Sequence, residues 1–88
     1  MPIGMTMRND KYIADSQGNA LASYGPRIDV GGAVEECEPE VAGCWGVYAY
    51  EPDGYAVCIG DALDEQSAAT FARNVALLAG IRNLLEAK

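Results

Sequence analysis

One tetrapeptide, Glu-Pro-Asp-Gly at residues 51–54, constrains the fold of this chain more than any other feature. In such a turn proline presets φ, aspartate accepts hydrogen bonds from the nearby backbone, and glycine adopts the left-handed conformation without a steric penalty. The stretches on either side, CWGVYAY and YAVCIGDA, are rich in aromatic and β-branched residues, which suit a half-buried pleated surface. The sequence therefore predicts a β-hairpin centred on this turn.

A second hairpin is predicted nearer the N-terminus. Two short apolar runs, residues 12–14 and 20–22, flank the polar segment Asp-Ser-Gln-Gly-Asn at residues 15–19. Gly18 supplies the positive φ that such a turn needs, because glycine has no Cβ to clash. The segment before this hairpin alternates only weakly, so a strand at residues 3–7 stays open.

The last third of the chain has helical periodicity. Asp64 is the expected N-cap, Glu65 adds negative charge to the first turn, and Lys88 ends the chain where a cation suits the helix dipole. Apolar residues recur at helical spacing along one side, and we expect this stripe to pack on the sheet. The stripe consists of Phe71, Val75, Leu78, Ile81 and Leu85, with Ala68, Ala72 and Ala79 beside them.

Between the hairpins, from Gly25 to about Gly43, both patterns break down, although RIDV at residues 27–30 is consistent with a short edge strand. The interruptions are Pro26, Gly31, Gly32 and Pro39. An antiparallel sheet of about four strands, made of two hairpins and covered by one C-terminal helix, is an α+β architecture. The 88 residues are expected to form a single domain, residues 1–88.

The chain is acidic, with thirteen Asp and Glu against six Lys and Arg and a net charge of -7. A nucleic-acid binder needs a basic patch that neutralises phosphates, whereas these six cations are scattered, so no direct nucleic-acid contact is expected. No apolar run approaches the roughly 20 residues of a membrane span, and no membrane contact is expected. The odd count of three cysteines excludes a complete disulfide framework and favours a reduced, cytoplasmic protein.

The stretch AVEECEPEVAGC, residues 33–44, concentrates the negative charge, and Pro39 favours an extended backbone there. Together with later carboxylates its glutamates are predicted to form one continuous negative face that docks on a basic protein surface, helped by long-range attraction. The residues of this face are Glu35, Glu36, Glu38, Glu40, Glu51, Asp53 and Asp61. The alternative is a solvated loop whose charges only keep the protein in solution.

The cysteines do not predict a metal or catalytic site. Cys37 and Cys44 are seven residues apart, Cys58 stands alone, and the chain has no histidine, whereas structural zinc sites use four ligands in closely spaced pairs. Cys58 lies between Val57 and Ile59 in a predicted strand and is expected to be a buried free thiol. We expect no metal, no cofactor and no catalytic residue, and leave open whether Cys37 and Cys44 pair.

The stretches YIADSQGNALASY (residues 12–24) and ARNVALLAGIRNLLEA (residues 72–87) together resemble the opening hairpin and closing helix of short hypothetical proteins encoded by tailed phages and prophages. The matching helix positions are Ala72, Asn74, Ala76, Leu77, Ala79, Leu84, Leu85, Glu86 and Ala87. Arg82 departs from the proline usual in those proteins. The resemblance carries no established activity, and it implies a small phage accessory protein of the kind that binds a host protein.

We therefore expect a non-enzymatic phage-type protein whose acidic face docks on a basic host protein in the host cytoplasm, for instance an anti-CRISPR-like inhibitor of a defence or nucleic-acid-handling complex. Two alternatives stay open. The start Met-Pro-Ile resembles the tautomerase superfamily, in which Pro2 would act as the base, although those proteins continue as strand, helix, strand. Sheet edges and aromatic residues would also suit a homo-oligomeric structural protein, such as a homodimer.

Overall fold

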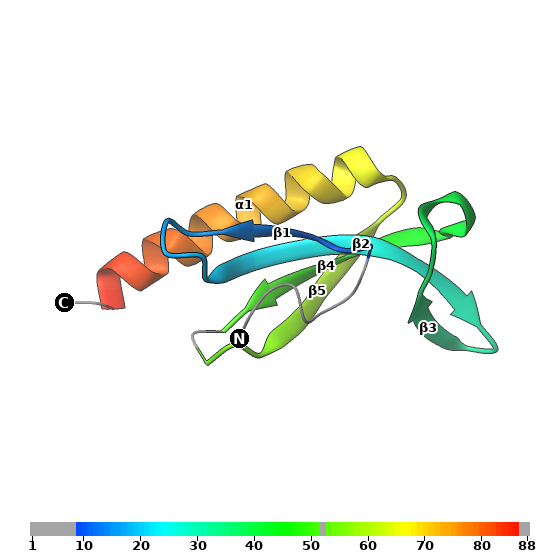
Figure 1. The fold of residues 1–88 in the computed structure, drawn as a ribbon, viewed down its shortest axis with the longest axis horizontal. Helices are drawn as coiled ribbons and strands as arrows, with labels where there is room; N and C mark the ends of the chain where they lie inside the picture. Colours follow the sequence, from blue (N-terminus) through cyan, green and yellow to red (C-terminus); the bar gives the residue numbers. More distant parts are fainter. Residues whose placement is uncertain (1–8, 52, 87–88) are drawn as a thin grey trace.

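A computed structural model gives the fold of the chain and describes residues 9–51 and 53–86, with side chains described as far as residue 81. Pro2, the strand considered at residues 3–7, Lys88 and the side chain of Leu85 lie outside the described residues. The elements are β1 (Lys11–Ala14), β2 (Ala20–Val30), β3 (Ala33–Glu36), the 3₁₀-helix η2 (Pro39–Val41), β4 (Cys44–Tyr50), β5 (Ala56–Ala62) and α1 (Glu65–Glu86). The α+β architecture is confirmed, because α1 packs across one face of an antiparallel sheet (Figure 1).

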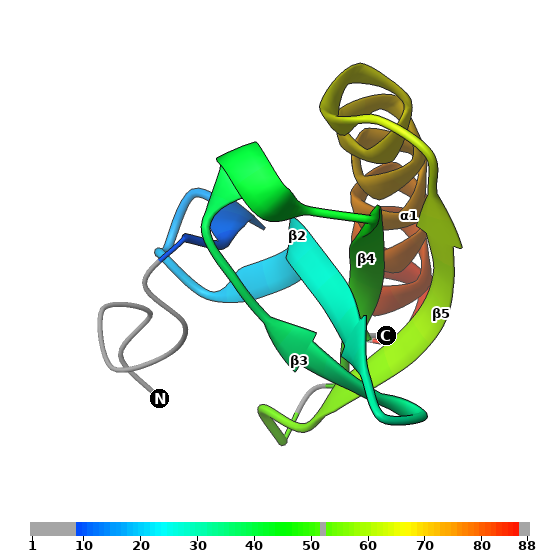
Figure 2. The ribbon, with the colours of Figure 1, turned by 90° about the vertical axis from the view of Figure 1, so that its right-hand side faces the viewer.

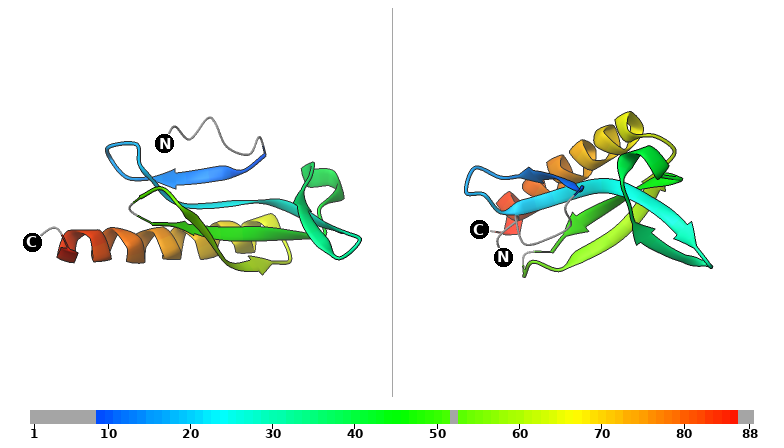
Figure 3. Two further views of the ribbon diagram at one scale, coloured as in Figure 1. Left: turned by 90° about the horizontal axis from the view of Figure 1, so that it is seen from below. Right: turned by 45° about the vertical axis from the view of Figure 1, so that its right-hand side comes forward.

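The sheet has five strands where about four were expected. Its order is β1-β2-β4-β5, and β3 also pairs with β2. β1 pairs with the first half of β2 and β3 with the second half, so β1 and β3 follow one another along the same edge, opposite β5. Seen from below, α1 lies along β4 on one face of this sheet (Figure 3).

Both predicted hairpins are confirmed, and their turns use the expected chemistry. In the first turn Gly18 has φ of 86°, and the Asp15 carboxylate accepts hydrogen bonds from the backbone N–H groups of Gln17 and Asn19. In the second turn Gly54 has φ of 94°, and Asp53 accepts a hydrogen bond from the N–H of Tyr55 at 3.1 Å. These short-range bonds fix each turn independently of the rest of the fold.

The strand expected at residues 27–30 is present, but it is not a separate short strand. These residues are the end of the 11-residue strand β2 and pair with β3 on one side, and of the four only Arg27 also pairs with β4 on the other. Gly31 and Gly32 have φ of 60° and 91°, which makes the two-residue turn of a third hairpin, β2–β3. Residues 33–36 are therefore a strand and not a loop.

Proline has no N–H, and Pro26 is tolerated inside β2 because no neighbouring strand needs a donor at this position. The Pro26 carbonyl accepts the N–H of Cys37 on the β1–β3 side of β2. In an antiparallel strand the N–H and C=O of one residue point to the same side. Pro26 follows the last residue paired with β1 and precedes the first residue paired with β3, so no partner strand requires its donor.

The helix stripe that contacts the sheet differs from the predicted one. The core consists of Ala22, Trp45, Val47, Ala68, Ala72 and Ala76. Alanine side chains let the helix backbone approach the sheet closely, and three larger residues of the predicted stripe lie to one side: Phe71, Leu78 and Ile81 are 37%, 67% and 49% exposed. The prediction was correct for Ala68 and Ala72, which are buried, and for Val75, which packs against the core; it was wrong for Leu78 and Ile81, which are exposed.

The N-cap of α1 is confirmed, since the Ser67 N–H donates to Asp64 Oδ1 at 2.7 Å. This bond lowers the pKa of Asp64 below its ordinary value of 3.8. A carboxylate with a lowered folded-state pKa stabilises the fold above its unfolded-state pKa, and this contribution disappears as the pH falls through the folded-state pKa. The variant Asp64→Asn keeps a good cap without the titration, so it is expected to lose less stability than the parent between neutral pH and about pH 2.

Urea unfolding across that pH range measures this difference. Asp15, whose pKa is also lowered by backbone hydrogen bonds from its turn, is the same in both proteins and cancels in the comparison. Parallel curves for parent and variant would show that the charge of the cap contributes nothing.

Candidate functional site

Four of the predicted site residues lie together at one end of the molecule. Glu35 and Glu36 are in β3, Glu38 immediately precedes η2, and Glu40 is inside it. We call these four residues the acidic edge. All four are exposed, and successive strand residues point to opposite faces, so Glu35 and Glu36 present charge on both sides of β3. Figure 2 shows β3 and the 3₁₀ segment together at this end.

The other three predicted residues are not part of this group. Glu51 and Asp53 flank the β4–β5 turn, at the far end of β4 from η2. A seven-residue strand spans about 20 Å, which separates this turn from the acidic edge. Asp61 lies on β5, opposite Gly46, on the other side of the sheet from β3. The structure thus brings four of the seven carboxylates together and places three elsewhere.

The cations of the sheet are bound by the chain's own carboxylates. Lys11 forms an ion pair with Glu65 at 2.8 Å, and this hydrogen bond and charge raise the pKa of Lys11. Arg27 forms an ion pair with Asp10. Within the described part of the chain, no ion pair involves Glu35, Glu36 or Glu40, so these carboxylates are not neutralised there by Lys11 or Arg27.

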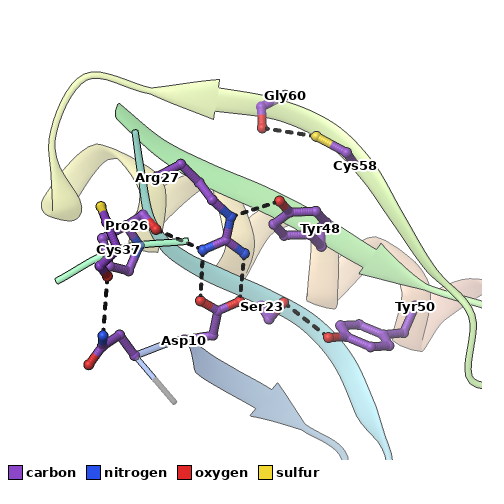
Figure 4. A network of polar contacts seen from close by, with 10 residues as sticks. Asp10, Ser23, Pro26, Arg27, Cys37, Tyr48, Tyr50, Cys58 and Gly60 are labelled. Carbon is purple, nitrogen blue, oxygen red and sulfur yellow. Dashed lines mark hydrogen bonds and ion pairs between the residues drawn. The ribbon is translucent and has the colours of Figure 1, made fainter. Parts of the chain in front are cut away.

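A buried ion pair, which sequence reasoning missed, lies next to the acidic edge (Figure 4). The Arg27 guanidinium donates to both carboxylate oxygens of Asp10 at 2.9 and 2.8 Å, and these side chains are only 4% and 2% exposed. Arg27 also donates to the Tyr48 hydroxyl at 3.0 Å and to the Pro26 carbonyl at 2.8 Å. Asp10 and, more weakly, Tyr48 raise the pKa of Arg27, which stays charged.

The sequence carries one signal for this pair, which is Gly25. A Cβ at Gly25 would overlap the Asp10 carboxylate, so the carboxylate lies directly over a strand position that has no side chain. Glycine inside a strand often marks a close approach by another part of the chain. A glycine in a strand does not identify the residue that packs against it, and Asp10 is 15 positions away from Gly25 in the sequence.

The same region anchors the start of the acidic segment. The Asn9 side chain donates to the Cys37 carbonyl at 3.1 Å and to Glu38 at 3.4 Å, and the Cys37 N–H donates to Pro26. At the end of the segment, the Gly43 N–H donates to the Arg27 carbonyl at 2.9 Å. The acidic edge is therefore held at both ends by hydrogen bonds to β2.

The three cysteines are free thiols. Cys37 and Cys44 are half-buried, and burial together with the charge of Asp61 raises the pKa of Cys44, which makes its thiolate scarce at neutral pH. Cys58 is exposed, so the expectation of a buried thiol was wrong: β5 is an outer strand that α1 covers only slightly. In the described residues, no group of three or more His, Cys, Asp or Glu side chains is arranged to hold a metal ion.

Comparisons of the chain with protein-family models, with curated proteins and with solved structures give no match. In the described part of the chain, α1 is too polar to qualify as a membrane span.

Proposed function

We propose that the protein is a non-enzymatic binding module whose acidic edge docks on a basic surface of another protein. The observation that carries this proposal is a set of four exposed carboxylates on an anchored backbone, of which Glu35, Glu36 and Glu40 form no ion pair with the described residues. An anchored segment loses less conformational entropy on binding than a free loop, so more of the electrostatic attraction appears as affinity.

The kind of partner follows from the charge. A protein groove that holds nucleic-acid phosphates is lined with Lys and Arg, and closely spaced carboxylates offer it a competing ligand. Together with the resemblance of both chain ends to phage proteins, this favours a phage accessory protein that occupies a host defence or nucleic-acid-handling complex. The protein would act by occupying the groove in place of nucleic acid, and this mechanism requires no catalytic residue.

The test uses immobilised protein and a nuclease-treated bacterial lysate, with bound proteins released by rising salt and identified by mass spectrometry. We expect a basic nucleic-acid-binding protein that is also displaced by duplex DNA. The variant with all four glutamates of the acidic edge changed to Gln is expected to bind it at least about tenfold more weakly, a loss of roughly 1.4 kcal/mol.

Two double variants serve as a matched pair. Glu35→Gln with Glu36→Gln removes two charges from the acidic edge, and Glu51→Gln with Asp53→Asn removes two from the distant turn. Only the first double variant is expected to weaken binding. Equal weakening by both would mean that net charge alone drives the association, and unchanged binding by the four-fold variant would refute the proposed surface.

A further inference from the structure

The strand β5 is an unprotected edge of the sheet. It pairs with β4 on one side only, and its other side has no partner strand among the described residues. Natural proteins shield such edges with short strands, lysine, proline or bulges, because a free row of backbone N–H and C=O groups pairs with other chains. The opposite edge follows this rule, since β1 and β3 have four residues each and carry Lys11 or glutamates.

β5 has little of this protection. It is seven residues long, Ala56 to Ile59 are all exposed, and its first charged residue is Asp61 near the end. Val57 and Ile59 are apolar side chains that are 44% and 38% exposed. The one protective device is the register shift opposite Val47 and Tyr48, which interrupts the strand near Ile59 and leaves residues 56–58 regular.

An uncovered helix stripe continues this apolar edge. The Phe71 ring lies 3.1 Å from where a Cβ on Gly60 would be, so this flank of α1 borders β5. Leu78, two turns further along, lies on the same flank because a helix has 3.6 residues per turn. Phe71 also lines a shallow open depression with Gln66, Ser67, Thr70 and Asn74, none of which is charged. Figure 2 shows β5 as the outer strand beside α1.

The occupant that fits this surface is a second copy of the chain. Two identical edges related by a two-fold axis pair antiparallel, and each satisfies the backbone groups of the other. The same axis keeps both helices on one face of the joined sheet, so that the Phe71–Leu78 flank of each helix faces that of the other. A basic partner has no reason to bind here, because residues 56–60 carry no charge.

We propose that two copies of this chain associate through antiparallel pairing of their β5 strands, with Phe71 and Leu78 of both helices closing the interface. The acidic edge is at the opposite side of the sheet, so it stays free in such a dimer. The proposal therefore does not depend on the proposed function.

Sedimentation velocity over a range of protein concentrations tests the association. We expect the parent to shift from monomer to dimer mass and Leu78→Glu to raise the dissociation constant at least about tenfold. Leu77→Glu is the matched control, because Leu77 is 64% exposed, against 67% for Leu78, but lies on the flank of α1 away from β5. Leu77→Glu is expected to dimerise like the parent. Cys58→Lys, which protects the strand edge itself, is expected to weaken dimerisation like Leu78→Glu.

Circular dichroism of each variant serves as the control for folding. A parent that keeps monomer mass throughout, or equal weakening by the two leucine variants, overturns the proposal. Salt separates this association from acidic-edge binding: copies with a net charge of -7 repel, so dimerisation is expected to strengthen as salt screens them, whereas binding of a basic partner weakens.

Discussion

Replacing Arg27 with methionine is expected to lower the free energy of unfolding by about 3–5 kcal/mol, because it leaves the Asp10 carboxylate buried without its cation. Asp10 and Arg27 are almost fully enclosed, at 2% and 4% side-chain exposure, so water does not compensate the lost charge. A domain of this size is stable by only about 5–10 kcal/mol, so the variant is expected to lose much of its stability. Urea unfolding followed by circular dichroism measures the loss.

A double-mutant cycle shows whether this loss belongs to the pair. Asp10→Ala alone is expected to be similarly harmful, because it leaves Arg27 buried and charged. The double variant Asp10→Ala/Arg27→Met removes both charges and is expected to lose less than the sum of the single losses, by about 2–3 kcal/mol. Additive losses would indicate that the two side chains stabilise the fold by packing alone.

A single methyl group at Gly25 is expected to have an effect as large as the loss of Arg27. The Cβ of Gly25→Ala would overlap Asp10 Oδ1 and Cγ, and the carboxylate cannot move aside without breaking its two hydrogen bonds to Arg27. We therefore expect a loss of about 3–5 kcal/mol in the free energy of unfolding. Because both changes act through Asp10, adding Gly25→Ala to Arg27→Met is expected to cost little more than either change alone.

Gly80→Ala serves as a control that is expected to raise the free energy of unfolding, whereas Gly25→Ala is expected to lower it. Gly80 lies within α1, and a Cβ there would meet no atom within 4 Å outside its immediate surroundings. Gly80→Ala is therefore expected to stabilise the protein by up to about 1 kcal/mol, since alanine favours helix. The same urea titration reports both glycine variants. A Gly25→Ala protein as stable as the parent would show that Asp10 does not need its position over β2.

The parts of the fold that the sequence predicted correctly are those fixed by neighbouring residues. The bonds from the N–H groups of Tyr55 and Ser67 to Asp53 and Asp64 span two and three residues, so local turn and cap chemistry was enough to locate the second hairpin and the start of α1. The Gly31–Gly32 turn is equally local, and its hairpin was missed because prolines nearby suggested a loop.

The features that the sequence did not reveal depend on the assembled sheet. Pro26 fits a central strand only because β1 ends and β3 begins beside it. The alanine face of α1 displaced the larger residues because close helix–sheet contact favours small side chains. For the candidate site, the four glutamates of one segment stayed together, whereas the length of β4 carries Glu51 and Asp53 to its other end.

The central position of β2 has a consequence for how the chain folds. β1 and β3 join β2 across short turns, but β4 pairs with β2 only after the intervening segment has closed, from Arg27 opposite Cys44 to Ala22 opposite Ala49. Closing a longer loop costs more chain entropy, so the β2–β4 contact is expected to form after the two hairpins that contain β2. The four glutamates of the acidic edge lie inside this closing loop. Their mutual repulsion opposes this closure, so the protein is expected to fold more slowly at low ionic strength than at high ionic strength.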